Sequence, residues 1–367
     1  MFIKKIKLKN FRCFKNEEFS FDNKLVVIEG QNGSGKTSLL EAIYYACYLR
    51  SFRTRLSREL VAFNDNHFFL EVDFDDSCEL QNQIQAGYSG KEGKVVKFNQ
   101  KQVSSYKDII SSYKIIGATE EDLQLIGKGP EERRSFLNQS LFLIDPDVSA
   151  IFRKYKQVLD QRNAILARNS NRQLDTNLKQ ELYSWTKQLW NHSSSLQSLR
   201  IEFLNKVENI VNTLLCDYFK DLAGIKIKLK YQPRNLSISD SFKKFWDWYQ
   251  KNLLEKELRW ARSMFGMHLD DFAISFKEKR ARFFASRGQQ KLILFLLKIA
   301  QLQMLQKAGE IPCFLLDDFL TDFDASRLDG FLNLFKNLEC QIFLTSPLQS
   351  FLGYNGSKQF DFQTLKL

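Results

Sequence analysis

The sequence predicts an α/β fold, with one head built from both ends of the chain and a helical lobe inserted between them. Strand-like patterns fill most of residues 2–118 and return near 272. The stretch 131–222 has no glycine and repeats apolar residues every three or four positions, which indicates long helices. A strand, a glycine-rich turn and a helix follow one another from residue 25. We therefore expect a head at 1–125 and 266–367 and a lobe at 126–265.

The head begins with strands. Residues 2–8 alternate apolar and basic side chains, the alternation resumes at 19–21, and 25–30 (LVVIEG) form an apolar strand. The run after Thr37 (SLLEAIYYACYL) has the composition of a buried helix. Short alternating runs between about 67 and 118 predict a region rich in sheet.

The middle and the end of the chain follow a different plan. We expect an antiparallel helix pair broken near 168–178, a short strand at 225–231 and a helix at about 239–264 whose Trp246, Trp248 and Trp260 pack inside the lobe. Sheet returns near 272–285. A helix at 288–307, a strand at 313–318, a helix at 325–337 and a strand at 340–346 complete the head.

Composition narrows the class of protein. The 367 residues are 44% hydrophobic with 16 Gly and 5 Pro, which excludes a collagen-like or disordered chain. There is no run of about 20 apolar residues, so we expect a soluble cytoplasmic protein with no membrane partner. The six cysteines are scattered without a C-x-x-C pair, as expected for free thiols in a reducing compartment.

The net charge of +11 favours a polyanionic partner. Charge alone does not choose between nucleic acid and an anionic membrane face. Two groups of basic residues make DNA, double- or single-stranded, the preferred hypothesis over a merely solvated surface. The candidate DNA-binding residues are Arg50, Arg53, Arg55 and Arg58 after the first helix, and Arg153, Lys154 and Lys156 at the start of a segment, 151–190, that carries eight basic residues against three acidic ones and also includes Arg162. No base-reading motif is present, so we expect contacts to the DNA backbone.

Residues 30–37 match the phosphate-binding pattern G-x-x-x-x-G-K-[ST] in full. Glycines let the backbone wrap a phosphate with its N–H groups pointing inward. Lys36 would reach the β- and γ-phosphates of ATP, and the Thr37 hydroxyl would bind Mg²⁺. The candidate nucleotide-binding residues are Gly30, Gln31, Asn32, Gly33, Ser34, Gly35, Lys36, Thr37 and Ser38. A plain glycine-rich turn is the weaker alternative.

Two carboxylates end the apolar strand at 313–318. Asp317 would hold Mg²⁺, and Asp318 would polarise an attacking water. The alternative is an acidic pair that caps the next helix. A third feature, Ser286-Arg287-Gly288-Gln289-Gln290-Lys291, precedes a long apolar helix. Ser286 suits a helix N-cap, and the free N–H groups there attract anions.

These motifs together resemble those of ABC-type P-loop ATPases. SRGQQ (286–290) is similar to their signature motif, and LLDDFLTDFD (315–324) to their Walker B strand and D-loop. The opening residues KNFRCF and GQNGSGKTSLLEAIYYACYLRSFRT resemble the SMC-like branch and, within it, the RecF family. The segments GPEERRSFLN (129–138), GMHLDD (266–271), ASRGQQKL (285–292) and QIFLTS (341–346) extend the resemblance; about 140–265 matches only in helical character.

The resemblance implies an ABC-type ATPase head whose ATP-dependent homodimer encloses two ATP molecules. Ser286, Gly288 and Gln289 of one copy would cover the ATP held by the loop of the other, and Asp324 would act as the D-loop aspartate across the interface. Lys36, Asp317, Asp318 and Ser286 would be the catalytic residues. The resemblance further implies DNA repair, recombination and replication-fork maintenance at single-strand gaps, with RecO and RecR as partners that help to load RecA.

Some positions depart from the family pattern. Asp318 stands where ABC enzymes usually carry Glu, and Thr345 and Ser346 stand where a switch His is expected. Residues 117–125 offer no clear Q-loop Gln, and Met267 and Leu269 replace Pro and Arg. We therefore expect a weak, DNA-stimulated ATPase with slow turnover. Another SMC-like or transporter-type ABC ATPase, or a non-hydrolysing ATP-gated scaffold, remains an alternative.

Overall fold

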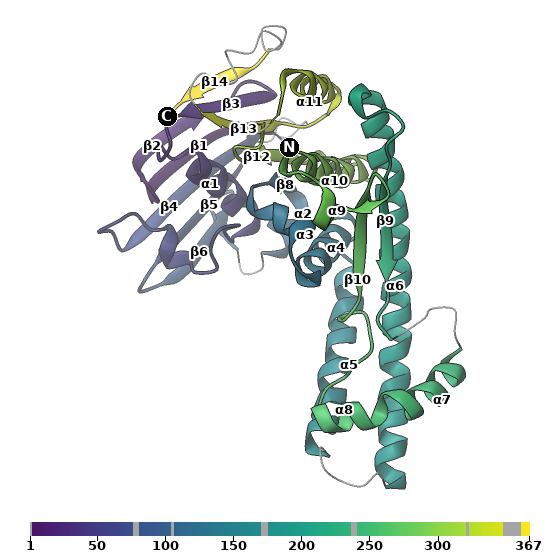
Figure 1. Cartoon of the computed structure of the whole chain (residues 1–367). Coiled ribbons are helices and arrows are strands. Elements are labelled where there is room, and N and C mark those ends of the chain that lie inside the picture. Colours follow the sequence, from purple (N-terminus) through teal and green to yellow (C-terminus); the bar gives the residue numbers. More distant parts are fainter. Residues whose placement is uncertain are drawn as a thin grey trace. The chain divides into compact units, whose positions relative to one another are not determined.

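The computed structural model describes residues 2–75, 81–103, 106–169, 175–235, 241–320, 323–347 and 361–367 (Figure 1). The chain forms two compact units. Unit 1 comprises Met1–Leu123, Leu214–Ala223 and Ser286–Leu367, and unit 2 comprises Gln124–Thr213 and Gly224–Ala285. Unit 1 thus contains both ends of the chain, with unit 2 inserted between them.

The elements follow one another in a strand-rich, then helical, then mixed order. Those of unit 1 are β1 (Phe2–Phe11), β2 (Phe14–Ser20), β3 (Leu25–Gly30), α1 (Lys36–Tyr48), β4 (His67–Asp75), β5 (Gln81–Ser89), β6 (Gly93–Phe98), β7 (Lys101–Gln102), α2 (Lys107–Ser112), β8 (Ile115–Ala118), α10 (Arg287–Lys307), β12 (Cys313–Leu316), α11 (Ala325–Asn337), β13 (Ile342–Pro347) and β14 (Gln363–Lys366). Those of unit 2 are α3 (Gln124–Gly127), α4 (Pro130–Ile144), α5 (Val148–Arg168), α6 (Thr176–Tyr218, whose last turn lies in unit 1), β9 (Ile227–Gln232), α7 (Phe242–Asn252), α8 (Leu254–Trp260), β10 (Asp271–Phe276), β11 (Lys279–Arg280) and α9 (Ala281–Phe284). Short 3-10 turns lie at Ser57–Leu60, Glu121–Leu123 and Lys220–Leu222.

A parallel sheet forms the centre of unit 1. Its strand order is β14-β3-β13-β12-β8, and neighbouring strands all pair in parallel. β3 is buried along its whole length, as parallel strands covered on both faces are. The carboxyl ends of β3, β12 and β13 therefore meet at one edge, where ligands bind in open α/β sheets.

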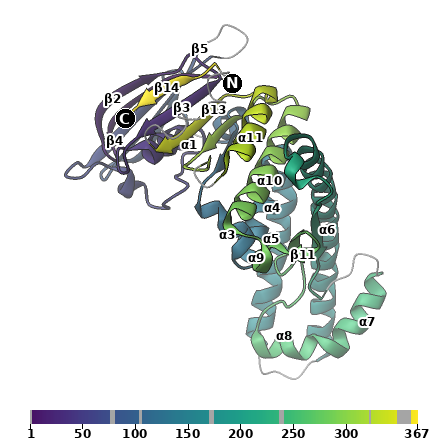
Figure 2. The same cartoon turned by 45° about the horizontal axis from the view of Figure 1, so that its top comes forward.

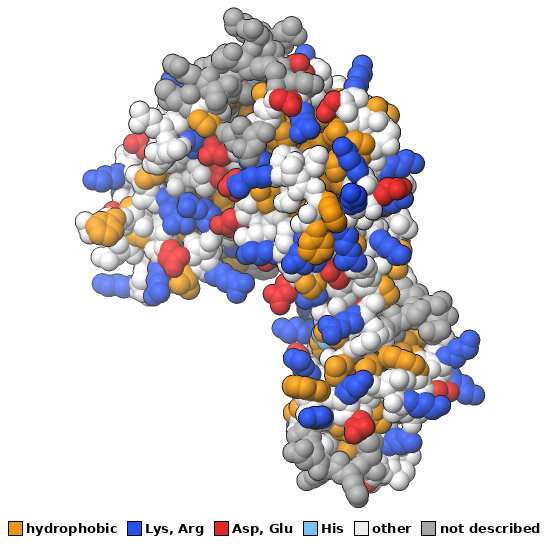
Figure 3. Space-filling model, viewed as in Figure 1, with side chains coloured by type: hydrophobic (Ala, Val, Ile, Leu, Met, Phe, Trp, Pro, Cys, Tyr) orange, Lys and Arg blue, Asp and Glu red, His pale blue; other side chains and the backbone are white. Residues whose placement is uncertain are grey.

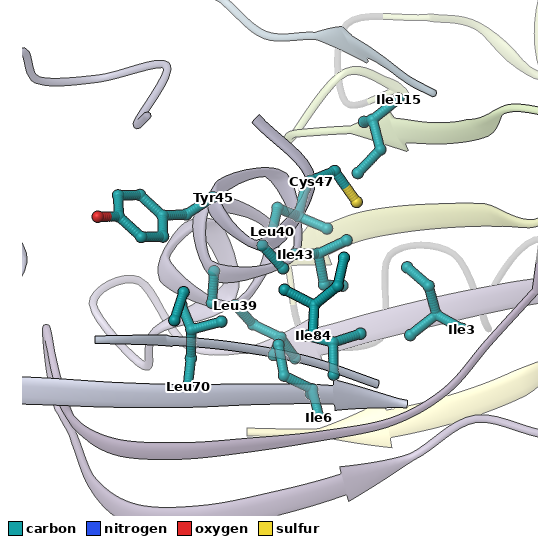
Figure 4. Packing of buried hydrophobic residues seen from close by; sticks show 14 of the residues in the cluster. Ile3, Ile6, Leu39, Leu40, Ile43, Tyr45, Cys47, Leu70, Ile84 and Ile115 are labelled. Atoms are coloured by element: carbon teal, nitrogen blue, oxygen red, sulfur yellow. The ribbon is translucent and has the colours of Figure 1, made fainter. Parts of the chain in front are cut away.

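Helix α1 packs between this sheet and a second, antiparallel one of order β2-β1-β4-β5-β6-β7. Figure 4 shows Leu39, Leu40 and Ile43 of α1 among side chains of the surrounding strands, including Ile6 and Leu70. Because α1 is enclosed in this way, its first turn has a fixed position, and so does the end of the phosphate loop that leads into it.

Helices α10 and α11 cover the parallel sheet beside β12 and β13 (Figure 2). Phe295 of α10 contacts both Phe314 of β12 and Phe331 of α11, with ring centroids 6.0 and 4.6 Å apart. The ring of Phe331 also meets Phe219, from the segment 214–223. This segment, expected in the lobe, consequently belongs to unit 1.

Unit 2 is helical with a small sheet. β10 pairs with β9 from Asp271↔Gln232 to Phe276↔Ile227, and with β11 on its other side. Residues 266–285, expected in the head, therefore belong to unit 2. The segment near the expected helix break at 168–178 lies partly outside the described residues.

The helix expected over 239–264 is divided. It forms α7 and α8, separated at Leu253, and residues 261–264 lie outside any helix. Trp246 is buried as expected, but Trp248 and Trp260 are 39% and 60% exposed, so the prediction that they pack inside the lobe is wrong. The presence of tryptophans in this segment therefore did not identify which of its faces is buried.

A buried ion pair links helices of unit 2. Arg162 of α5 and Glu257 of α8 are both fully buried, with a side-chain separation of 2.5 Å. Arg162 also donates to Thr186, Ser263 and Tyr249. Arg162, counted in the sequence among the basic residues of a DNA-binding face, is therefore unavailable to DNA. Among the described residues, no helix is long and apolar enough to cross a membrane.

Candidate nucleotide-binding site

The phosphate loop connects the end of β3 to the start of α1. Gly33 and Gly35 have positive φ angles of 86° and 108°, a conformation that favours glycine. A Cβ atom at Gly35 would lie 2.7 Å from Cys13 Sγ and 2.8 Å from the Phe14 ring. Glycine is thus required at 35 by both backbone and space, as the motif predicts.

Lys36 and Thr37 open α1 at this loop. The buried Lys36 ammonium donates to the carbonyls of Gly30 and Gln31, at 2.9 and 3.1 Å. The Thr37 hydroxyl donates to the Asp317 carboxylate, 2.9 and 3.0 Å from its two oxygens. Ser38 is buried behind them, whereas Gln31 and Asn32 are exposed at the tip of the loop. The structure thus joins the phosphate loop to the acidic strand end.

The acidic pair is organised by a threonine from the neighbouring strand. Thr345 of β13 donates to Asp317 Oδ1 at 2.9 Å, and its oxygen accepts from the Asp318 backbone N–H at 2.7 Å. Asp318 has φ 44°, which is uncommon for a residue with a Cβ and often found at functional sites. The sequence identified Thr345 only as the replacement for a switch His, so its contacts with both aspartates are new.

Burial sets the electrostatics of Asp317. Its desolvation raises the pKa of the carboxyl, and the hydrogen bonds from Thr37 and Thr345 oppose this rise. A buried carboxylate beside two hydroxyls offers the hard oxygen ligands that a divalent cation such as Mg²⁺ takes.

The serine motif begins α10. Ser286 Oγ accepts from the Gln289 backbone N–H at 3.3 Å, and the Gln289 side chain accepts from the Ser286 N–H at 3.0 Å. This reciprocal pair is a capping box, so Ser286 is the N-cap that the sequence suggests. Ser286 is exposed and Gly288 is half-buried. Asp324 likewise caps α11, where it accepts from the Arg327 N–H at 3.0 Å.

Two groups of predicted residues remain separate within the described chain. Lys36, Thr37, Asp317 and Asp318 form one connected cluster. Among the described residues, no hydrogen bond or ion pair joins Ser286, Gly288, Gln289 or Asp324 to the phosphate loop. Their nucleotide-binding role therefore remains a prediction that needs a second copy.

Helix α10 is linked by ion pairs to the segment that follows β8. Arg287 pairs with Glu120, and the buried Lys291 ammonium lies 3.6 Å from the same carboxylate. Arg287 is the largest contributor to a lowered Glu120 pKa, through its hydrogen bond and charge. Farther along α10, Lys298 meets Asp122 at 3.1 Å. The segment that lacks a Q-loop Gln thus contacts α10 through two carboxylates.

One of the arginines after α1, Arg53, lies beside a buried carboxylate that the sequence did not single out. Glu41 of α1 is fully buried and receives two hydrogen bonds from Arg12, at 2.7 and 2.8 Å. Arg53 lies 3.7 Å from the same carboxylate. The candidate DNA-binding residues Arg50, Arg55 and Arg58 are exposed. The contacts of Glu41 with Arg12 and Arg53 join residues that are distant in the sequence, so they could be recognised only once the fold was known.

Arg153, Lys154 and Lys156 are exposed on α5, as a DNA-binding role requires. Lys and Arg side chains also lie across much of the face seen in Figure 3, interspersed with fewer acidic ones. Exposure agrees with nucleic-acid contact but does not test it.

A parallel sheet with a phosphate loop, an acidic strand end and a serine-capped signature helix defines a P-loop head of the ABC type. The model of the family described as RecF/RecN/SMC N terminal domain matches residues 2–357, and the chain belongs to that family. This confirms both the predicted ABC-type fold and the resemblance to RecF proteins.

Curated relatives support the same family. The chain is 30% identical to the DNA replication and repair protein RecF of Natranaerobius thermophilus, over 95% of this chain and 91% of that protein. It is also 30% identical to the protein of the same name from Acetivibrio thermocellus, over 94% and 93% of the two chains.

Solved structures extend the likeness to three dimensions. A structure described as the recombination mediator protein RecF-ATP in the RecFOR pathway has a TM-score of 0.79 and 26% identity, and the match covers 95% of this chain and 92% of that one. The Smc head domain of Pyrococcus furiosus has a TM-score of 0.57 at 14% identity, over 96% and 91% of the chains, and shows the shared fold.

Proposed function

We propose that this chain is an ATP-binding DNA repair and recombination protein whose two copies close over two bound ATP molecules and thereby bind DNA. The observation that carries the proposal is the joined cluster of Lys36, Thr37 and Asp317 at the carboxyl edge of a parallel sheet. The likeness to a RecF-ATP structure supports ATP as the nucleotide.

The phosphate loop fits a triphosphate. Ser34 Oγ is buried without a hydrogen-bond partner among the described residues, and the Lys36 ammonium donates to the loop carbonyls of Gly30 and Gln31. Phosphate oxygens would satisfy both groups, and the positive end of α1 would favour the charge. Thr37 and Asp317 would hold Mg²⁺, which neutralises charge developing on the phosphates when it is bound.

Hydrolysis is assigned to the acidic pair. Asp318, held by Thr345, would orient and deprotonate a water, while Asp317 keeps Thr37 in place. The carboxylate of Asp reaches less far than that of Glu, so turnover should be slow. Absence of any turnover would instead favour the ATP-gated scaffold, in which the same site closes the dimer without hydrolysis.

The second half of the site would come from another copy. Ser286 and Gly288 at the exposed start of α10 would meet the γ-phosphate on the partner's loop, with Gln289 supporting the cap and Asp324 at the interface. A helix N-terminus with free N–H groups suits an anion. Opening after hydrolysis would release the DNA.

DNA binding would use the exposed basic residues of α5 and those after α1. Glu41 of the helix that begins at Lys36 lies 3.7 Å from Arg53 of the second group, so this arginine contacts the helix that also carries the phosphate-binding lysine. Membership of the RecF family supports the proposal that the protein acts at single-strand gaps, where RecO and RecR would act with it to load RecA.

The proposal is tested by size measurement with ATP, ADP and no nucleotide, with and without gapped DNA. We expect a dimer with ATP, more of it with DNA, and monomers otherwise. Lys36→Ala should stay monomeric because its loop loses the ammonium, whereas Lys298→Ala, a lysine lost elsewhere in unit 1, should still dimerise. ATP-dependent dimers of Lys36→Ala at wild-type ATP concentrations would contradict the assignment.

A further inference from the structure

Two neighbouring phenylalanines of unit 2 are unusually exposed. Phe283 and Phe284 of α9 are 66% and 65% exposed. Within the described ranges the only other exposed phenylalanine is Phe63. Exposed aromatic pairs are costly to leave in water, so a partner that covers them is expected.

Cations surround both rings. Lys279 Nζ lies 5.2 Å from the ring centroid of Phe284, and Arg282 lies 5.4 Å from that of Phe283. Lys277, Lys279, Arg280 and Arg282 are all exposed, against the single acid Glu278 in the same stretch. Each ring therefore lies beside a positive charge and leaves much of its surface open.

The adjoining sheet continues the positive charge. In the small sheet, Lys228 of β9 and Arg280 of β11 lie opposite Ser275 of β10, one on each side. Lys230 of β9 lies opposite Ala273 of β10. Directly opposed residues share one face of an antiparallel sheet. Small side chains thus separate exposed lysines and an arginine on that face. A hollow of about 130 Å³ beside it is lined by Arg280, Arg282 and Phe283.

We propose that β9–β11 and α9 form a binding site for single-stranded DNA, in which Phe283 and Phe284 stack on unpaired bases and the flanking cations meet phosphates. Basic grooves with exposed aromatic rings bind single strands in this way. In a duplex the bases stack on one another, so their faces are not free to stack on the rings of Phe283 and Phe284. The proposal rests on the proposed DNA binding and names its site on unit 2.

The charges favour nucleic acid over a protein partner. Lysine is depleted at the centres of protein interfaces. Here Lys279 lies against the ring of Phe284, and Lys228, Lys230 and Lys277 are also exposed within residues 227–284. The one acidic side chain lining the hollow, Asp271, is paired with Arg133 at 2.7 Å, so it adds little repulsion toward phosphate.

The test measures binding of a labelled oligothymidylate and of an abasic oligomer of equal length without nucleotide, because the single-strand site lies within unit 2 of one copy and does not need the ATP-closed dimer. The variant Phe283→Ala/Phe284→Ala should bind oligothymidylate about tenfold more weakly or worse, since each stack contributes substantially. Binding of the abasic oligomer should not change. Phe63→Ala, the matched exposed control, should match wild type on both.

Two further variants keep the test decisive. Phe283→Tyr/Phe284→Tyr should retain binding, because tyrosine also stacks. Lys228→Gln/Arg280→Gln should weaken both oligomers and reduce the salt dependence of binding, with a slope change of about 0.7 per lost phosphate contact.

Several results would overturn the proposal. Unchanged oligothymidylate affinity in the double alanine variant would remove the stacking role, and an equal loss on the abasic oligomer would show a structural effect. Loss of ATP-dependent dimers with unchanged oligothymidylate affinity would assign the rings to a second copy. Since the titration uses no ATP, failure here and failure of ATP-driven dimerisation are separate results.

Discussion

At the scale of single residues, hydroxyl groups set the geometry of the acidic pair. Thr37 and Thr345 both donate to Asp317, and Thr345 also accepts from the Asp318 backbone. One side chain from β13 thereby holds both the carboxylate of Asp317 and the backbone of Asp318, just after the end of β12. The position that usually senses the γ-phosphate through a His is occupied here by a side chain that holds the acidic pair.

Thr345→Val tests this role with little change in shape. Loss of the hydroxyl removes a hydrogen bond to a charged group, a contribution of about 1.5–3 kcal/mol. ATP turnover should fall roughly tenfold to a hundredfold, whereas ATP affinity should change less, because the phosphate loop is intact. Thr345→Ser, which keeps the hydroxyl, should restore turnover. Wild-type turnover in the valine variant would show that Asp318 needs no such support.

At the scale of elements, the sequence predicted those with strong local signals. The strand at 25–30, the helix after Thr37 and the helix at 325–337 have clear apolar patterns with a glycine or Asp at the boundary, and the structure places them as β3, α1 and α11. The capping pattern at Ser286 also indicated the start of α10 within one residue. Local chemistry determines these boundaries.

Elements that depend on distant partners were missed. β14 has only four residues and forms because it pairs with β3, more than 300 positions earlier in the chain. The assignment of β10 and β11 to unit 2 depends on pairing with β9. Arg162 followed the apolar repeat of α5, but its burial depends on Glu257, a partner 95 positions away.

The pair Arg162–Glu257 links α5 to α8, and Arg162→Met should therefore destabilise the protein. An uncompensated Glu257 would remain fully buried, at a cost of about 3–5 kcal/mol. Urea unfolding followed by circular dichroism measures the loss. Lys156→Met, an exposed control on the same helix, should change the free energy of unfolding by about 0.5 kcal/mol or less. Equal effects of the two variants would show that the ion pair contributes little to stability.

At the scale of the whole molecule, we propose that one chain carries two half-sites. The phosphate loop and acidic pair are assembled within unit 1, because they follow β3 and β12, two parallel strands of one sheet that lie on either side of β13. Ser286 and Asp324 cap their own helices, Gly288 lies in the first turn of α10, and these three residues contact no part of the loop among the described residues. We propose that they meet the nucleotide held by another copy.

The most direct test of this two-copy site mixes two variants that each fail alone. Lys36→Ala lacks a working loop, and Ser286→Arg blocks the opposing cap, so each alone should remain monomeric with ATP. Their equimolar mixture contains heterodimers with one intact composite site, formed by Lys36 from one copy and Ser286 from the other. Sizing by light scattering should therefore detect ATP-dependent dimers in the mixture. A mixture that stays monomeric, or dimers of Ser286→Arg alone, would contradict the account.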